Sequence, residues 1–120
     1  YVNETITGNV YRYKTLTHRG REFFGNVIED DGQIYYRGPD GMKFSESGLL
    51  YCAVFGQGDV TVLSHDGSIV KRIQTLGRKP TNVVFGLKGT KTLLVTEYEK
   101  GNLESHNVGE DGLPLFMGVF

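Results

Sequence analysis

The residues best suited to chemistry in this sequence are polar side chains that follow a proline at two equivalent points. The segments 39–44 (Pro-Asp-Gly-Met-Lys-Phe) and 80–85 (Pro-Thr-Asn-Val-Val-Phe) align without gaps. The carboxylate of Asp40 is suited to binding a hard cation such as calcium, or to accepting a proton from water. A structural interpretation is also available, because proline and aspartate are both common in turns, here a turn that leads into a strand. Spacing alone leaves both interpretations open.

Three similar copies of a strand, a polar loop and a second strand must position these residues. The copies begin at Tyr1, Tyr51 and Leu94, so they start 50 and 43 residues apart. Each loop ends in Gly-Asn or Gly-Asp, at positions 8–9, 58–59 and 101–102. A repeat of about 40–50 residues is typical of four-stranded propeller blades. The sequence therefore predicts an all-β fold made of β-propeller blades.

The two proline segments precede the second and third copies, which sets the order of strands within a blade. We expect a partial blade over 1–36, a complete blade over 37–78 and a last blade over 79–120, about two and three-quarter blades in all. The expected strands are 1–5, 9–14 and 21–28, then 39–45, 49–55, 58–64 and 68–75, then 80–86, 92–98, 101–107 and 114–119. The first strand of each blade lines the central channel of a propeller, so Asp40, Thr81 and Asn82 should converge at one mouth.

Asp-Gly pairs after three of these segments predict hairpin turns, because glycine adopts the positive φ that tight turns require. They are Asp31-Gly32, Asp66-Gly67 and Asp111-Gly112. The segment 68–75 lacks clean alternation, which indicates the outermost, partly solvated strand of its blade.

Composition narrows the partners and the compartment. With 13 Lys and Arg against 14 Asp and Glu in 120 residues, the charge pattern does not indicate binding to nucleic acid or to an anionic membrane. No apolar run approaches the ~20 residues that a bilayer-spanning helix requires. The single Cys52 excludes an internal disulfide and is expected to be a small buried residue. A reducing compartment is compatible with this, and we expect a cytoplasmic protein.

An arc of fewer than three blades cannot close into a ring, and it would expose apolar sheet faces. We therefore expect either the C-terminal part of a longer propeller or a protomer that completes its ring with other copies of itself.

The order of the motifs resembles the C-terminal half of the gluconolactonase, senescence-marker-protein and luciferin-regenerating-enzyme family. The matching runs are 1–5, 10–13, 38–44, 49–58, 62–67, 79–86, 92–96 and 112–116. The resemblance implies a six-bladed propeller that hydrolyses lactones with one divalent cation, calcium or zinc, at the channel mouth. It also implies that Asp40 ligates this metal and acts as the general base. Thr81 and Asn82 are weaker candidates for substrate contact, with a role in a turn as the alternative.

The family's other metal ligands, a glutamate and an asparagine, belong upstream of Tyr1. The resulting hypothesis is metal-dependent hydrolysis of a sugar lactone by the parent propeller, with calcium as the expected metal. The alternative is a non-catalytic fragment, or an oligomerising binding or scaffold propeller without a complete metal site. Glu4 and Glu97 occupy equivalent repeat positions, which favours a structural role. The histidines at 18, 65 and 106 share no ligand-like spacing.

Overall fold

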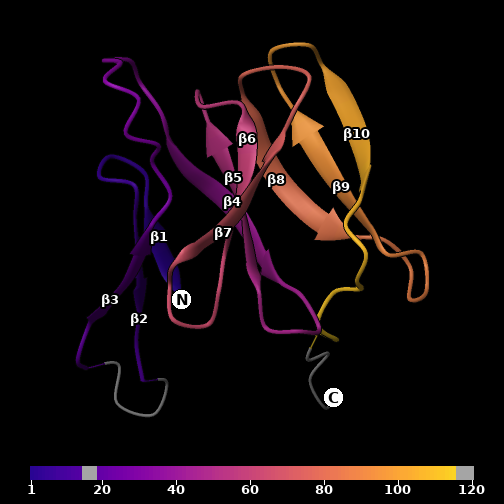
Figure 1. Ribbon diagram of the computed structural model, residues 1–120, viewed down its shortest axis with the longest axis horizontal. Helices are drawn as coiled ribbons and strands as arrows, with labels where there is room; N and C mark the ends of the chain where they lie inside the picture. The colour runs from indigo at the N-terminus through magenta and orange to yellow at the C-terminus, as the bar shows by residue number, and fades with distance from the viewer. Residues whose placement is uncertain (15–18, 116–120) are drawn as a thin grey trace.

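The structure is a computed structural model that describes residues 1–14 and 19–115. Over these residues the chain forms ten strands and no helix (Figure 1). The strands are β1 (Val2–Glu4), β2 (Asn9–Arg12), β3 (Glu22–Asn26), β4 (Gly38–Phe44), β5 (Leu50–Phe55), β6 (Asp59–Leu63), β7 (Ile69–Gln74), β8 (Pro80–Phe85), β9 (Thr92–Glu97) and β10 (Asn102–Asn107). The predicted all-β fold is confirmed. No helix long and apolar enough to cross a membrane occurs in the described part of the chain.

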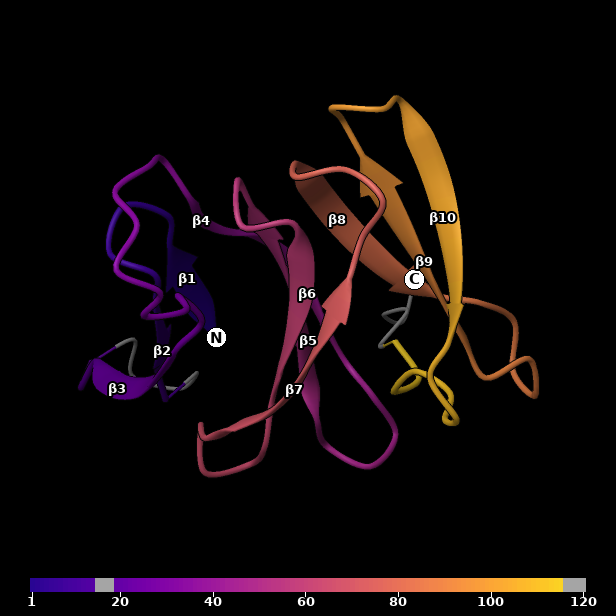
Figure 2. The same ribbon diagram turned by 45° about the horizontal axis from the view of Figure 1, so that its top comes forward.

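The strands form three antiparallel sheets that follow one another in chain order. Their strand orders are β1-β2-β3, β4-β5-β6-β7 and β8-β9-β10. Figure 2 shows the sheets standing side by side, with the four-stranded sheet between the other two. The first strands of the second and third sheets, β4 and β8, contact each other. Successive sheets with adjacent first strands are the arrangement of blades in a β-propeller.

The glycines of the repeated loops all adopt a left-handed conformation. Their φ values are 79° at Gly8, 81° at Gly58 and 69° at Gly101. Glycine takes this conformation without the steric cost that a Cβ atom imposes. Each of these loops joins two hydrogen-bonded antiparallel strands, namely β1 with β2, β5 with β6 and β9 with β10. The threefold repeat therefore corresponds to the same structural unit in each sheet.

The central sheet is buried on both faces, which explains why its second strand is apolar throughout. Leu50, Cys52 and Val54 of β5 pack toward the first sheet. Tyr51 and Ala53 pack toward the third sheet. Successive side chains of a strand point to opposite faces, so a strand between two cores has no solvent-facing position. The continuous apolar run at 50–54 is the result.

Within residues 1–14 and 19–115, one of the three predicted Asp-Gly hairpins forms. Asp66-Gly67 joins β6 to β7, and Gly67 has a φ of 84°. Asp31-Gly32 lies instead in the long connection between β3 and β4, two strands of different sheets. The hairpin prediction is wrong there because the chain has finished one blade and must travel to the inner strand of the next.

The hairpin prediction at Asp111-Gly112 is also wrong, whereas the predicted strand over 114–119 lies mostly outside the described residues. Gly112 forms a bridge with Ser45, and the Leu113 N–H donates to the Phe44 carbonyl at 3.0 Å. The end of β4 thus satisfies backbone groups that a hairpin with β10 would have used. Residues 114 and 115 are not in a strand, and 116–119 lie outside the described residues.

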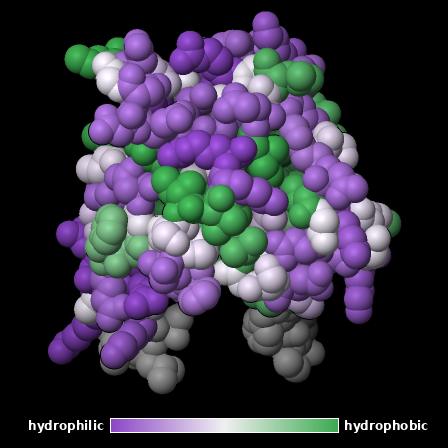
Figure 3. Space-filling model, in the orientation of Figure 1, coloured by the Kyte–Doolittle hydropathy of each residue, from purple (hydrophilic) through white to green (hydrophobic). Residues whose placement is uncertain are grey.

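The outer faces of the first and third sheets carry solvent-exposed apolar side chains. On the first sheet, Val2 pairs with Tyr11, which pairs with Phe23; on the third sheet, Val84 pairs with Leu94 and Leu103 lies on the same face. Phe23 is 63% exposed and Leu103 is 68% exposed. Figure 3 shows a further group of apolar side chains near the middle of the face in view. These sheet faces resemble the contact faces of blades that lack a neighbour.

A buried carboxylate joins the first and second sheets. Asp59 is fully buried, and its oxygens accept hydrogen bonds from Gln57 Nε2 at 3.0 Å and Thr61 Oγ1 at 2.7 Å. Arg72 Nη1 lies 3.9 Å from Asp59 Oδ2 and donates to the carbonyl of Val27, the residue that follows β3 of the first sheet. Burial raises the pKa of Asp59 above its ordinary value, against the opposing effect of these hydrogen bonds.

This shift predicts that Asp59→Asn lowers the free energy of unfolding by less, relative to wild type, as the pH rises. A raised folded-state pKa means that Asp59 favours folding below its ordinary pKa, and that this contribution is lost as the pH rises through the folded-state value. Asparagine has no such titration, and it already occupies the equivalent positions 9 and 102. Urea unfolding should place the variant within about 1 kcal/mol of wild type at pH 7, with a larger deficit at pH 4. A deficit that grows from pH 4 to pH 7 would contradict this.

Candidate active site

A β-bulge near the start of β4 presents Asp40 to solvent. The pairing of β4 with β5 shifts between Pro39 and Met42, which leaves Asp40 and Gly41 opposite the single residue Ala53. A bulge turns side chains away from the regular alternation of a strand. Asp40 is exposed, and its carboxylate makes no hydrogen bond or ion pair with any residue that the structure describes. It is free to act on a bound molecule.

The same irregularity recurs in β8 and brings Asn82 next to the bulge of β4. The pairing of β8 with β9 shifts between Pro80 and Asn82. A Cβ atom added to Gly41 would lie 1.9 Å from Asn82 Oδ1 and 2.8 Å from Asn82 Cα. Only glycine at position 41 permits this approach of two inner strands. Asn82 therefore lies against the residue that follows Asp40.

The first sheet also reaches the Asp40 bulge. Asn3 Nδ2 donates to the Asp40 carbonyl oxygen at 2.5 Å, and Thr5 Oγ1 donates to the Pro39 carbonyl at 3.0 Å. These bonds fix the backbone on which the carboxylate is mounted. Sequence reasoning did not single out Asn3. The one feature of the sequence that could have indicated this role is the position of Asn3 in the first strand of the preceding repeat, β1.

Thr81 and Asn82 differ in what their polar atoms can offer. The Thr81 hydroxyl is paired with Thr96 Oγ1 at 2.8 Å, across the bulge. Asn82 Oδ1 accepts the Val83 N–H at 2.9 Å, while its Nδ2 has no hydrogen-bond partner within the described ranges. Asn82 is thus the one of the two whose donor group is available to a ligand.

The described residues do not by themselves form a site for a divalent cation. Among residues 1–14 and 19–115, no three His, Cys, Asp or Glu side chains lie close enough together to hold a metal ion. Calcium takes six to eight oxygen ligands, and structural or catalytic zinc takes three or four nitrogen, sulfur or carboxylate ligands. Asp40 provides one carboxylate, with the carboxamides of Asn3 and Asn82 nearby. These side chains alone do not complete a metal site.

Glu97 has a structural function rather than a catalytic one. It is 2% exposed, and its carboxylate accepts backbone N–H bonds from Lys79 at 2.9 Å, Glu99 at 2.9 Å and Lys100 at 2.7 Å. Burial opposes its ionisation, but the three hydrogen bonds outweigh burial and hold the pKa of Glu97 below its ordinary value. Glu97 ties the loop before β8 to the loop after β9.

The other candidates are also accounted for by local contacts. Glu4 Oε2 accepts the Thr7 hydroxyl at 2.5 Å, and His106 Nε2 lies 3.0 Å from Glu104. Cys52 is fully buried, and burial raises the pKa of its thiol to about 12, so it is not a reactive nucleophile. His18 lies outside the described residues.

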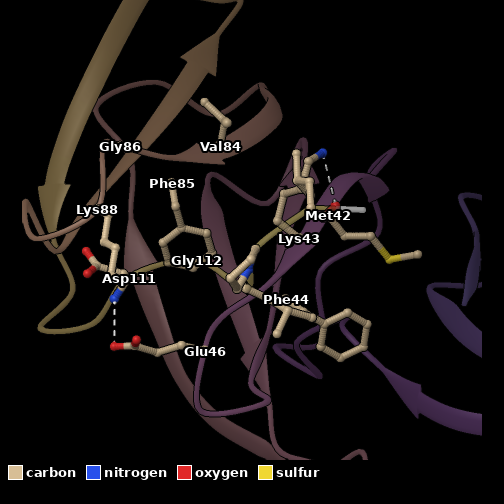
Figure 4. A pocket seen from close by; sticks show the side chains of 13 residues that line it. Met42, Lys43, Phe44, Glu46, Val84, Phe85, Gly86, Lys88, Asp111 and Gly112 are labelled. Carbon is tan, nitrogen blue, oxygen red and sulfur yellow. Dashed lines mark hydrogen bonds between the residues drawn. The ribbon is translucent and has the colours of Figure 1, made fainter. Parts of the chain in front are cut away.

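Two cavities flank the inner strands at opposite ends. One, of about 560 Å³, lies where β4 and β8 end and is lined mainly by apolar side chains such as Phe44, Val84 and Phe85 (Figure 4). On its rim the Asp111 N–H donates to Glu46 at 3.2 Å. The other, of about 500 Å³, lies at the end where β4 and β8 begin. It is lined by Asp31, Gln33, Ile34, Tyr35, Tyr36, Gly56, Arg78, Lys79 and Glu99.

The fold has solved counterparts. A structure of a luciferin-regenerating enzyme superposes with a TM-score of 0.64 at 20% sequence identity, covering 88% of this chain and 39% of that one. At this level of identity the similarity establishes the fold, a partial β-propeller.

Sequence similarity points to the same family. The chain is 32% identical over 96 residues to a 6-deoxy-6-sulfogluconolactonase of Pseudomonas putida, covering 80% of this chain and 33% of that protein. It is 23% identical over 129 residues to the cell growth-regulated gene 1 protein of Candida albicans, covering 92% and 36% respectively. The chain thus spans about a third of the length of these relatives.

A family model described as the SMP-30/gluconolactonase/LRE-like region matches residues 1–99, which include the bulges of both inner strands. The match covers the first two sheets completely and the third through β9. The chain belongs to the SMP-30/gluconolactonase/LRE-like family.

Proposed function

We propose that this chain carries the general base of a lactonase that hydrolyses sugar lactones. The observation that carries the proposal is the exposed, unpaired carboxylate of Asp40 on a bulge of an inner strand. Family membership and the similarity to a 6-deoxy-6-sulfogluconolactonase support a sugar lactone as the substrate class. Together they favour hydrolysis of the cyclic ester over the other chemistries that a propeller can host.

In the proposed reaction Asp40 takes a proton from the attacking water. The water oxygen bonds to the lactone carbonyl carbon, and the ring C–O bond then breaks, with a proton passing to the departing alkoxide to give the hydroxy acid. Asn82 Nδ2 is suited to donate a hydrogen bond to the substrate, because Gly41 allows Asn82 to lie against the Asp40 bulge. Asn3 holds the Asp40 peptide in place through its bond to the carbonyl oxygen.

A divalent cation, calcium by preference, is proposed as a partner of this site, with Asp40 as the ligand that this chain would supply. Such an ion, when bound, polarises the lactone carbonyl and favours ionisation of water.

The experiment that tests the proposed function is acid release from glucono-1,5-lactone by the full-length protein, followed in a pH-stat. The chelator-treated protein and the same protein with calcium restored are assayed in parallel. The proposal expects hydrolysis above the buffer rate, its loss on chelation and its return with calcium. Hydrolysis that is unaffected by chelation would contradict the proposed metal dependence. The absence of hydrolysis in every sample would contradict the proposed lactonase activity.

The exposed faces of the outer sheets favour a second candidate, an assembly in which further sheets cover them. Phe23 and Leu103 lie on these faces and are mostly exposed. A sheet face of this kind is stabilised by burial against another sheet. Light scattering of the 120-residue chain would show association into a closed oligomer if copies of the chain complete the ring. A monomer at micromolar concentration would contradict ring closure by copies of the chain.

A further inference from the structure

We propose that the 500 Å³ cavity at the end where β4 and β8 begin binds a negatively charged substituent of the substrate, through Arg78 and Lys79. The proposal rests on the proposed lactonase function and specifies its substrate class. The substrate would be a sugar lactone that bears a phosphate, sulfonate or carboxylate group. The cavity lies in a loop cluster to which β4 contributes no lining residue, so the subsite is separate from Asp40 itself.

The cavity is on the same end of the sheets as Asp40. Its walls come from the loops before β4 and β8 and from the turns after β5 and β9. In Figure 1 these loops lie together at the upper end of the molecule, where β4 and β8 begin. Gly38, two residues before Asp40, pairs with Phe55, and the Phe55 ring lies 5.8 Å from Lys79 Nζ. A lactone held near Asp40 can therefore extend a substituent toward Lys79.

The two cations that line the cavity are not neutralised by carboxylates. Neither Arg78 nor Lys79 forms an ion pair with any residue in the described part of the chain. The guanidinium of Arg78 stacks on the Tyr35 ring at 4.8 Å, and Lys79 Nζ lies over the rings of Phe55 and Tyr98. Aromatic faces position a cation without using up its hydrogen bonds, so these donors remain available to an anion.

The acidic side chains around the cavity are largely engaged elsewhere. Asp31 is paired with Arg37, with Nη1 to Oδ2 and Nη2 to Oδ1 both at 3.0 Å. Hydrogen bonding to Arg37 lowers the pKa of Asp31, as expected of a bidentate pair. Glu97 is occupied by three backbone N–H groups. Among the described residues, Glu99 is the one lining carboxylate whose side chain has no such partner, and it limits the positive charge of the cavity.

The backbone that carries the two cations is held before any ligand arrives. The Lys79 N–H donates to Glu97 Oε1 at 2.9 Å, and the Lys79 carbonyl accepts the Tyr98 N–H at 2.9 Å. Gly58, with a φ of 81°, leaves room for Arg78, whose Cα would lie 3.2 Å from a Cβ at position 58. A fixed pair of adjacent cations loses little freedom on binding, which favours affinity.

The test is binding of open-chain sugar acids to the full-length protein by isothermal titration calorimetry. Gluconate, 6-phosphogluconate and inorganic phosphate serve as probes, so catalysis is not needed. We expect 6-phosphogluconate to bind at least tenfold more tightly than either gluconate or phosphate. Arg78→Met and Lys79→Met should each weaken 6-phosphogluconate binding at least fivefold and leave gluconate binding unchanged. Glu99→Gln should strengthen 6-phosphogluconate binding.

Lys88→Met is the matched control, because Lys88 lines the other cavity. This variant should bind 6-phosphogluconate as tightly as wild type. Circular dichroism confirms that each variant is folded. Equal affinity for gluconate and 6-phosphogluconate, or no binding of either, would overturn the subsite. Phosphate binding as tight as that of 6-phosphogluconate would also overturn it, in favour of a site for free inorganic anions. If wild type does not hydrolyse the lactone but still binds 6-phosphogluconate more tightly than gluconate, the result would contradict the proposed function but support the subsite.

Discussion

Replacing Asp40 by asparagine is expected to lower kcat/KM for a sugar lactone by about 10²–10⁴-fold, the range over which general bases contribute. Asparagine has nearly the same shape as aspartate and cannot take a proton from water. The Asn3 and Thr5 hydrogen bonds are made to backbone carbonyls, so the bulge that presents the side chain should survive the substitution. The measurement is steady-state hydrolysis of the full-length variant beside wild type.

The stability of this variant provides the control. Asp40 is exposed and makes no side-chain bond to the described residues, so the free energy of unfolding should change by less than about 0.5 kcal/mol. Reduced activity with unchanged stability assigns the loss to chemistry. Activity within twofold of wild type would show that Asp40 is not the base.

Replacing Glu97 by valine is expected to lower the free energy of unfolding by about 2–4 kcal/mol, because three charge-assisted backbone hydrogen bonds lose their acceptor. Valine is the residue at the equivalent position 54 of the central repeat. The matched control is Glu4→Val, at the equivalent position of the first repeat, where the carboxylate bonds only to Thr7 in the described structure. The control should cost less than about 1 kcal/mol.

The Glu97 effect should also depend on pH. The pKa of Glu97 is lowered in the folded state, so its contribution is present above its ordinary pKa and is lost as the pH falls through the folded-state value. Urea unfolding at pH 7 and in acid checks this. A difference between wild type and Glu97→Val that stays constant into acid, or that equals the Glu4→Val effect, would contradict the structural account.

Much of the fold was predictable because the repeats carry both periodicity and turn chemistry. Gly8, Gly58 and Gly101 each occupy the same φ-positive turn between paired strands, as the alignment predicted. The segment 68–75 is the outer strand of its sheet and is largely exposed, as its irregular alternation indicated. Local sequence decides such features, since they involve residues close together in the chain.

The predictions that are wrong concern contacts between blades. Asp31-Gly32 and Asp111-Gly112 have the composition of hairpin turns, yet the first lies in a connection between sheets and the second pairs with the end of β4. Turn propensity does not reveal which sheet the next strand joins. The same limit applies to the site, because Asn3 reaches Asp40 from another sheet, 37 residues away in the chain.

The proximity of the candidate residues was predictable in part. The alignment of Pro39 with Pro80 placed Asp40 and the pair Thr81-Asn82 near the start of successive inner strands, and the structure brings Asn82 against Gly41, the residue after Asp40. The cation pair of Arg78 and Lys79 was not predicted, because its aromatic partners come from three separate segments. Only the folded arrangement shows that these charges face a cavity.

The most direct test of the central claim is a pH-stat comparison of wild type and Asp40→Asn on glucono-1,5-lactone at equal protein concentration. The account predicts acid release well above the buffer rate for wild type and a rate close to buffer for the variant. Equal rates for the two proteins, whether fast or at the buffer level, would contradict the assignment of lactone hydrolysis to Asp40.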